Sequence, residues 1–335
     1  LLLTLTGVRE KILNAISPSM KNAIAVGIGL FIAFIGLRNA GLIVSDPGTA
    51  VKLNPQFLSP DIVVFFCGLV VAAALHARRV RGSILWGIAA GALLACALRL
   101  ALPVVPGDPA SSAVVAESGL MRQFRFAEGV VAMPPAVTPT LLQMDLVGAL
   151  SAAMIPFIVI FLFMDVFDTI GTLVAVGEQG GFIKDNKLPR ARQAMLADAV
   201  GTVGGAALGT STVTSYIESA TGIEYGGRTG LASATTAVLF LLAVFFSPLI
   251  AMVGSYAPIT APALVIVGAM MMRNVRQIDW SDYSECIPAF ITIIGIPLSY
   301  SIADGLALGF ISYPIIKLCS GNWRQAGWLS YALGA

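Results

Sequence analysis

Three aspartates stand inside apolar stretches of the chain, where an ionised side chain is costly. Asp165 and Asp168 lie three residues apart in the apolar run 150–176, and Asp198 lies in the run 191–208. A spacing of three residues places Asp165 and Asp168 on one face of a helix. Because carboxyl groups at membrane depth mark proton relays or ligand sites by default, these acids are the first candidates for function. Each could instead pair with a structural partner, and Asp198 could merely bond nearby backbone.

A polar segment rich in threonine and serine, residues 209–225, separates two apolar runs. Its β-branched residues favour extended backbone, and Ser215-x-x-Glu218 matches a capping box that begins a short helix. Irregular backbone at membrane depth is tolerated only where it lines a cavity or is buried in protein. The N-terminus of the short helix would offer free N–H groups to a polar, planar ligand. Glu218 is therefore a candidate ligand contact as well as a cap.

Composition identifies the surroundings of these acids. Apolar residues make up 57% of the 335 residues and charged residues only 11%, whereas a soluble domain carries about a quarter charged residues. Apolar runs of roughly 17–25 residues recur, which is long enough to cross about 30 Å of hydrocarbon as helices, and unbroken runs exclude a membrane β-barrel. The sequence predicts an all-α polytopic membrane protein. The expected spans lie near 20–44, 61–77, 82–101, 150–176, 191–208, 230–253, 259–275, 286–300 and 302–319.

Several other classes of protein find little support in the sequence. The four cysteines are far apart and His76 is the single histidine, so no disulfide framework, metal site or other cofactor site is expected. The net charge of +2 and the lack of a basic tail give no sign of nucleic-acid binding. Against a membrane-embedded enzyme stand the lack of a second histidine, of a Cys–His pair and of metal-ligand spacing. A transporter is therefore favoured over an enzyme, and a channel is kept as an alternative.

The positions of lysine and arginine predict how the spans are oriented. If residues 209–225 cross the membrane as a discontinuous segment, most lysines and arginines fall in loops on the same side of the membrane. Because cytoplasmic loops carry the excess of these cations, that side is predicted to be cytoplasmic. An Arg-Asn pair begins at Arg38 and again at Arg273, each near the end of a span that two further spans follow. That arrangement suggests two halves inserted with opposite topology. The cations on the opposite side are Arg38, Lys52, Arg99, Arg122 and Arg125.

Two motifs resemble the azaguanine-resistance type of purine permease, within the nucleobase–cation symporter superfamily of xanthine/uracil permeases and nucleobase–ascorbate transporters. They are Phe167-Asp-Thr-Ile-Gly-Thr-Leu173 and Gly209-Thr-Ser-Thr-Val-Thr-Ser-Tyr-Ile-Glu-Ser-Ala-Thr-Gly-Ile223, continuing through Gly226-Gly-Arg-Thr-Gly230. The resemblance covers nearly the whole chain. It implies proton-driven import of adenine, guanine or hypoxanthine across a bacterial cytoplasmic (inner) membrane. A related carrier for uracil, xanthine or a small anion is the alternative.

The resemblance also implies an architecture of fourteen spans in two inverted repeats of seven, each with four core spans and three gate spans. The third span of each repeat is a short strand with a half-helix, and the substrate lies between the two. On that plan we expect the chain to be a fragment that lacks the first core spans. The expected domains are 1–19 (end of span four and cytoplasmic loop), 20–101 (gate spans five to seven), 102–149 (extracytoplasmic loop with a short interfacial helix), 150–253 (core spans eight to eleven), 254–319 (gate spans twelve to fourteen) and 320–335 (truncated C-terminal segment).

Two acids match substrate contacts of the superfamily. In its uracil carriers, the span-eight acid stands in a Glu-His-Ile-Gly motif and the span-ten acid precedes an asparagine; both bond the edge of the base. The matching residues here are Asp168, in Asp-Thr-Ile-Gly, and Glu218, which precedes Ser219. Because aspartate is one methylene shorter than glutamate, we expect Asp168 to leave room for a bicyclic purine.

The remaining expected roles also follow from the resemblance. Thr169 replaces the histidine of the uracil carriers, which leaves Asp165, Asp168, Asp198 and Glu218 as candidates for the proton route. Of these, Asp165 and Asp198 are the expected proton-coupling acids. The expected partners are a purine nucleobase, a proton and the lipid bilayer, without nucleic acid or cofactor; whether the chain forms a homodimer is left open. The further substrate contacts expected are Thr214 and Ser215, with Phe167 or Tyr216 stacked on the ring.

Overall fold

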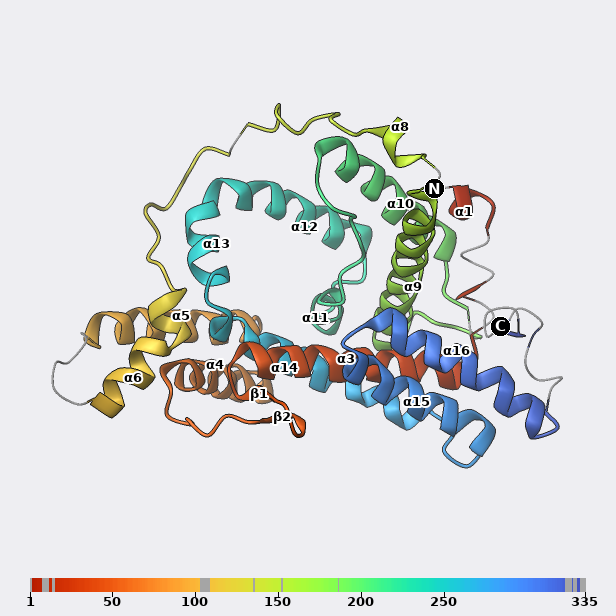
Figure 1. Cartoon of the computed structure of the whole chain (residues 1–335), viewed down its shortest axis with the longest axis horizontal. Helices are drawn as coiled ribbons and strands as arrows, with labels where there is room; N and C mark the ends of the chain where they lie inside the picture. Colours follow the sequence, from red (N-terminus) through yellow and green to blue (C-terminus); the bar gives the residue numbers. More distant parts are fainter. Residues whose placement is uncertain are drawn as a thin grey trace. The chain divides into compact units, whose positions relative to one another are not determined.

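The fold was obtained as a computed structural model. It describes residues 2–7, 12–13, 16–102, 109–134, 136–151, 153–185, 187–322, 327 and 330–331. Arg9, Lys11 and Arg324, which belong to the predicted cytoplasmic cations, lie outside these residues. The described chain is mostly helical (Figure 1) and divides into two compact units. The first unit holds Leu1–Phe31, Pro135–Gly226 and Met270–Ala335, and the second holds Ile32–Pro134 and Gly227–Ala269.

Apolar helices of spanning length confirm the membrane prediction. The helices α9 (Ile155–Gln179) and α10 (Ala191–Leu208), which carry the three aspartates, have 25 and 18 residues, enough to cross about 30 Å of hydrocarbon. Among the described residues, five other helices are both long and apolar enough to cross a membrane. They are α3 (Pro18–Asn39), α4 (Pro60–Ala77), α5 (Ser83–Ala101), the run from α12 to α13 (Gly230–Gly254) and α16 (Ile302–Cys319).

The first unit contains a tight helical hairpin of α15 (Tyr283–Ser299) and α16, which lie side by side in Figure 1. Small residues permit this approach, because a Cβ on Gly305 would overlap the backbone of Ile296. The start of α3 packs against α15 through a buried apolar cluster that includes Val26, Ala289 and Ile293. The hairpin and α3 therefore form one packed layer, and α9 contacts it through α16.

The segment between α10 and α11 (Ser219–Glu224) has no regular structure over residues 210–216. The prediction of a short helix after this segment is confirmed, but the predicted capping box is wrong. The helix begins at Ser219 with Glu218 as its N-cap, and the Glu218 side chain makes no capping hydrogen bond. The Ser215 hydroxyl is directed to Asp198 instead, so it is not available to cap the helix.

The second unit packs the end of α3 with α4, α5 and the start of α14 (Ala261–Met271), and it contains a hairpin that the sequence did not predict. The predicted span 20–44 ends at Asn39, and strands β1 (Ile43–Asp46) and β2 (Ala50–Leu53) pair antiparallel with Ile43 opposite Leu53. The carboxylate of Asp61 accepts hydrogen bonds from the Gly119 and Leu120 amides and from the Tyr256 hydroxyl. These bonds join α4 to α7 (Gly119–Arg122) and to the loop that precedes η2 (Ala257–Ile259).

Short elements complete the described chain. In its described residues the predicted loop 102–149 holds three short helices where one was expected. The predicted span 259–275 is only partly α-helical, because it continues as a 3₁₀ helix after Met271. The predicted orientation and the core and gate domains are not tested by these elements and stay predictions. The short elements are α1 (Leu2–Leu5), α6 (Pro109–Glu117), α7 (Gly119–Arg122), α8 (Leu146–Ala149), η2 (Ala257–Ile259) and η3 (Met272–Gln277). The spanning run Gly230–Gly254 consists of α12 (Gly230–Ala243), η1 (Val244–Phe246) and α13 (Ser247–Gly254).

Candidate substrate-binding cavity

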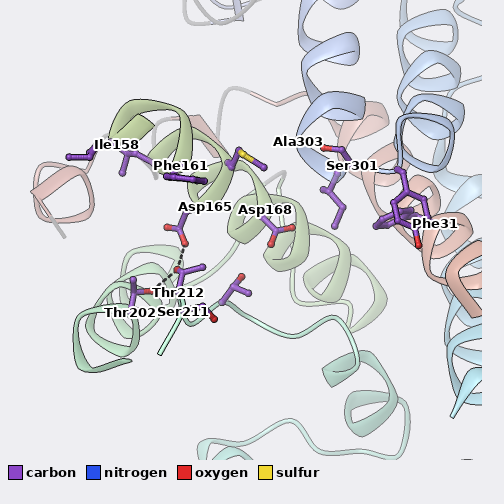
Figure 2. Close-up of a pocket in the computed structure, with 15 residues that line it drawn as sticks. Phe31, Ile158, Phe161, Asp165, Asp168, Thr202, Ser211, Thr212, Ser301 and Ala303 are labelled. Carbon is purple, nitrogen blue, oxygen red and sulfur yellow. Dashed lines mark hydrogen bonds between the residues drawn. The ribbon is translucent and has the colours of Figure 1, made fainter. Parts of the chain in front are cut away.

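The first unit contains a cavity of about 1010 Å³, whose wall Figure 2 shows. Helix α9 supplies one side, α10 and the irregular segment after it supply another, and α3, the α15–α16 turn and the start of α16 supply the rest. A volume of this size is at the upper end for small-molecule sites, which are typically about 300–1,000 Å³. The lining residues are Phe31, Ile158, Phe161, Leu162, Met164, Asp165, Asp168, Thr202, Ser211, Thr212, Thr214, Tyr300, Ser301, Ile302 and Ala303.

Two carboxylates of α9 face this cavity, as expected of side chains three residues apart on a helix. The Asp165 Oδ1 accepts a hydrogen bond of 2.8 Å from the Thr212 hydroxyl, drawn in Figure 2. Asp168, by contrast, has no hydrogen-bond partner within the described part of the chain. An ionised carboxylate is an acceptor with several lone pairs, so Asp168 offers its full accepting capacity to a ligand.

Asp198 has different surroundings, because it is buried behind the cavity wall. The residue is 7% exposed. Its carboxylate accepts hydrogen bonds from the hydroxyls of Thr169 at 3.1 Å and Ser215 at 3.5 Å. Thr202 adds a second attachment from α10, since its hydroxyl donates to the backbone oxygen of Val213 at 2.7 Å. Together with the bond from Thr212 to Asp165 on α9, these bonds hold the irregular segment against α9 and α10, although the segment has no ladder of backbone hydrogen bonds.

Thr214 stands out within the held segment. Its hydroxyl oxygen is buried and has no hydrogen-bond partner among the described residues, although the residue lines the cavity. Leaving a buried hydroxyl unpaired costs about 1–3 kcal/mol. A bound ligand that pairs with this hydroxyl would recover part of that free energy, so Thr214 is a suitable ligand contact.

The aromatic residues of the cavity are not those predicted. Phe31 and Tyr300 line it and contact each other edge to face, with ring centroids 5.4 Å apart. Phe167 packs on Phe310 with centroids 5.6 Å apart, and Tyr216 is 65% exposed; neither belongs to the lining. Nothing in the sequence distinguishes Phe31 from the other phenylalanines of the apolar runs.

The structure thus brings together Asp165, Asp168 and Thr214 of the predicted site. Glu218 is exposed at the N-cap of α11 and is not part of the cavity lining, and Ser215 bonds to Asp198 behind the wall. The ligand and proton roles of all these residues stay predictions. Residues at the α15–α16 turn were missed, because a turn between two apolar runs gives no signal of a ligand site.

Comparison with known proteins places the chain in a family. The Permease family (Xan_ur_permease) matches residues 1–308. The chain is 48% identical over 334 residues to MJ0326 of Methanocaldococcus jannaschii, a protein named as a permease, covering 99% of this chain and 71% of that protein. It is 42% identical over 333 residues to the guanine/hypoxanthine permease PbuG of Bacillus subtilis (99% and 70%) and 38% identical over 325 residues to the adenine permease AdeQ of Escherichia coli (97% and 67%). With its apolar helices of spanning length, the chain therefore belongs to the Permease family as a multi-pass membrane transporter.

Proposed function

We propose that the chain imports purine nucleobases, namely adenine, guanine or hypoxanthine, across the cytoplasmic membrane. The named substrates of PbuG and AdeQ support the substrate class. The observation that carries the proposal is the Asp168 carboxylate, which has no hydrogen-bond partner among the described residues and faces the same cavity as the buried hydroxyl of Thr214. A planar base with several N–H groups on its edge is a chemical match for these two groups.

The edge of a purine presents both donors and acceptors. An ionised Asp168 accepts from ring N–H and exocyclic amino groups, whereas the Thr214 hydroxyl can donate or accept. The hydroxyl therefore tolerates either an oxo or an amino substituent at the position that it meets. Hydrogen bonds to a charged group contribute about 1.5–3 kcal/mol, so Asp168 should dominate the affinity.

We further propose that proton symport drives the uptake. Asp165 and Asp168 lie close together on one helix face, and Asp198 lies behind them on α10. Like charges in a poorly hydrated site repel each other, and protonation of one carboxyl group relieves the repulsion. Entry of a proton from the outside would thereby prepare the site for the base. Asp165, which already has the Thr212 hydroxyl as a partner, is the proposed coupling residue.

Transport would proceed by alternating access within the inverted-repeat architecture of fourteen spans. In that scheme α9, α10 and the irregular segment belong to the core domain, and α3, α15 and α16 belong to the gate domain. The cavity has walls from both sets of elements, which is the expected position of a substrate in such a transporter. Glu218 is kept as the second base-binding acid on the strength of the resemblance, and Glu218→Gln tests this assignment by the same uptake measurement.

Uptake of labelled adenine, guanine and hypoxanthine tests the proposal, in bacteria that lack their own purine carriers. We expect accumulation that collapses with a protonophore and is not competed by unlabelled uracil. Asp168→Asn should abolish it, whereas Asp185→Asn in an exposed loop should not. Competition by uracil or xanthine would instead identify the related carriers. Equilibration without accumulation, together with ionic conductance, would identify a channel.

A further inference from the structure

We propose that Phe31 and Tyr300 form an aromatic wall on which the flat face of the transported base stacks, while Asp168 and Thr214 bind its edge. This inference rests on the proposed function and adds the residues that recognise the ring itself. All four residues line the same cavity, but they come from different elements. Asp168 lies on α9 and Thr214 on the irregular segment, whereas Phe31 lies on α3 and Tyr300 at the α15–α16 turn.

The mutual orientation of the two rings suits a planar ligand. Their planes are 86° apart, with the centroids separated by 5.4 Å. A base stacked parallel to one ring is therefore nearly perpendicular to the other, so it makes one stacked contact and one edge-to-face contact. Offset-stacked and edge-to-face contacts are the two arrangements that aromatic rings prefer. The pair can thus hold a flat heterocycle through both kinds of contact at once.

The backbone at Tyr300 supports a role for its ring. Tyr300 adopts a left-handed conformation, with φ of +56°, immediately after the last residue of α15. Glycine or asparagine adopts this conformation at lower cost than tyrosine does, and such strained residues cluster at ligand sites. The turn is otherwise well fixed, since the Ser301 hydroxyl accepts a hydrogen bond from the Asp304 amide at 3.2 Å. The strained tyrosine is thus held at a defined place in the wall.

The other aromatic residues near the site are less suitable. Phe167 is engaged by Phe310, and Tyr216 is outside the lining. Phe161 lines the cavity, but it lies one helical turn before Asp165 on the same helix. It therefore flanks the acids and cannot stand opposite them, whereas the Phe31–Tyr300 pair, on other elements, can.

A stacking wall has a consequence for specificity. Stacking strength grows with the area of overlap, so the wall should favour bicyclic purines over monocyclic pyrimidines that present a similar hydrogen-bonding edge. Asp168 and Thr214 would then bind the edge of the ligand, and the aromatic pair would select for the size and planarity of its ring. Removing a ring should therefore weaken purine binding.

The test is equilibrium binding of labelled hypoxanthine to the purified full chain in detergent, with uracil and the other purines as competitors. Phe31→Leu and Tyr300→Leu remove a ring and keep an apolar side chain, whereas Phe31→Tyr and Tyr300→Phe keep the ring. We expect the first two to weaken hypoxanthine binding about tenfold or more and the last two to stay within about threefold of the unsubstituted protein. Phe290→Leu, on an exposed face of α15 outside the cavity, is the matched control and should bind normally.

The outcomes separate this inference from the proposed function. Unchanged hypoxanthine affinity in Phe31→Leu and Tyr300→Leu, with binding lost in Asp168→Asn, would overturn the aromatic wall and leave the function standing. If Phe31→Tyr and Tyr300→Phe lose as much hypoxanthine affinity as the leucine variants, the wall is also overturned, because these two variants keep the ring. If the unsubstituted protein binds no nucleobase, both proposals fail. Melting temperatures of the variants show whether each one is folded.

Discussion

Lys317 is a fully buried cation near the end of α16, and its replacement by methionine should destabilise the protein strongly. Its Nζ lies 2.8 Å from Oε1 of Glu285 and 3.5 Å from Oδ2 of Asp282, and it donates to the Ser284 hydroxyl at 2.7 Å. The Lys317 side chain is 0% exposed and that of Glu285 only 16%. The pair therefore ties the end of α16 to the start of α15 in an environment that water hardly enters.

The structure sets the size of the effect. Removing one partner of a buried ion pair typically costs about 3–5 kcal/mol, because the other charge is left uncompensated. In Lys317→Met, Glu285 keeps two hydroxyl donors, Ser17 at 2.9 Å and Tyr313 at 3.1 Å. We therefore expect a loss of about 3 kcal/mol, at the lower end of that range. Adding Glu285→Gln to Lys317→Met removes the stranded charge and should restore most of the stability.

Thermal unfolding in detergent, followed by intrinsic fluorescence, measures this series. Lys317→Met should melt well below the unsubstituted protein, and the double variant should melt above Lys317→Met. Lys187→Met removes an exposed loop cation and serves as the matched control. The reasoning is refuted if Lys317→Met melts like Lys187→Met, or if the double variant is less stable than Lys317→Met.

Three further predictions concern single positions. Thr214→Val should weaken purine binding about fivefold, since a neutral hydrogen bond contributes roughly 0.5–1.5 kcal/mol. It should also raise the melting temperature of the ligand-free protein, because it removes a buried hydroxyl that has no partner among the described residues. Thr214→Ser keeps the hydroxyl and should have neither effect. Gly305→Ala should lower stability by about 1–3 kcal/mol, because its Cβ would overlap the backbone of Ile296, whereas Gly254→Ala, with open space around it, should be neutral in the same melting assay. Hydrogen bonds from the Ser284 side chain and amide hold the pKa of Asp282 below its ordinary value of 3.8. The stabilisation by ionised Asp282 is therefore present above that pH and lost as the pH falls through the lower folded-state value. Asp282→Asn should thus melt lower at neutral pH, and the deficit should shrink in melting curves recorded progressively below pH 3.8.

The spans were predictable from the sequence because burial in lipid demands long apolar runs, and such runs are visible in composition alone. The errors occur where hydrogen bonding decides the structure. The run 20–44 continues past the end of α3 into β1, so hydropathy concealed the hairpin. The turn residues Asp46-Pro-Gly-Thr49 were the available signal, because this composition favours a tight turn. Asp46 in fact accepts hydrogen bonds from the Gly48 and Thr49 amides.

The site was predictable to the extent that its members are unusual for their surroundings. Asp165 and Asp168 were found because carboxyl groups are rare in apolar runs, and both line the cavity. Phe31 and Tyr300 were not found, since aromatic residues are ordinary in such runs and these two meet only through the packing of α3 beside the α15–α16 turn. Ser215 was misassigned because its hydroxyl could either cap α11 or donate to a carboxylate, and in the structure it donates to the buried Asp198.

The hydrogen-bond partners of the three aspartates suggest a division of roles that their sequence context does not. Asp168 has no hydrogen-bond partner among the described residues, so both oxygens of its carboxyl group are available to the substrate. Asp165 accepts from the Thr212 hydroxyl and lines the cavity, so it can be reached from there. Asp198 accepts from two hydroxyls and is nearly inaccessible. A carboxyl group that must exchange a proton with water needs access, whereas one that holds a segment in place needs burial and bound partners. We therefore expect Asp198 to act mainly on the shape of the cavity wall, and Asp165 to carry the proton.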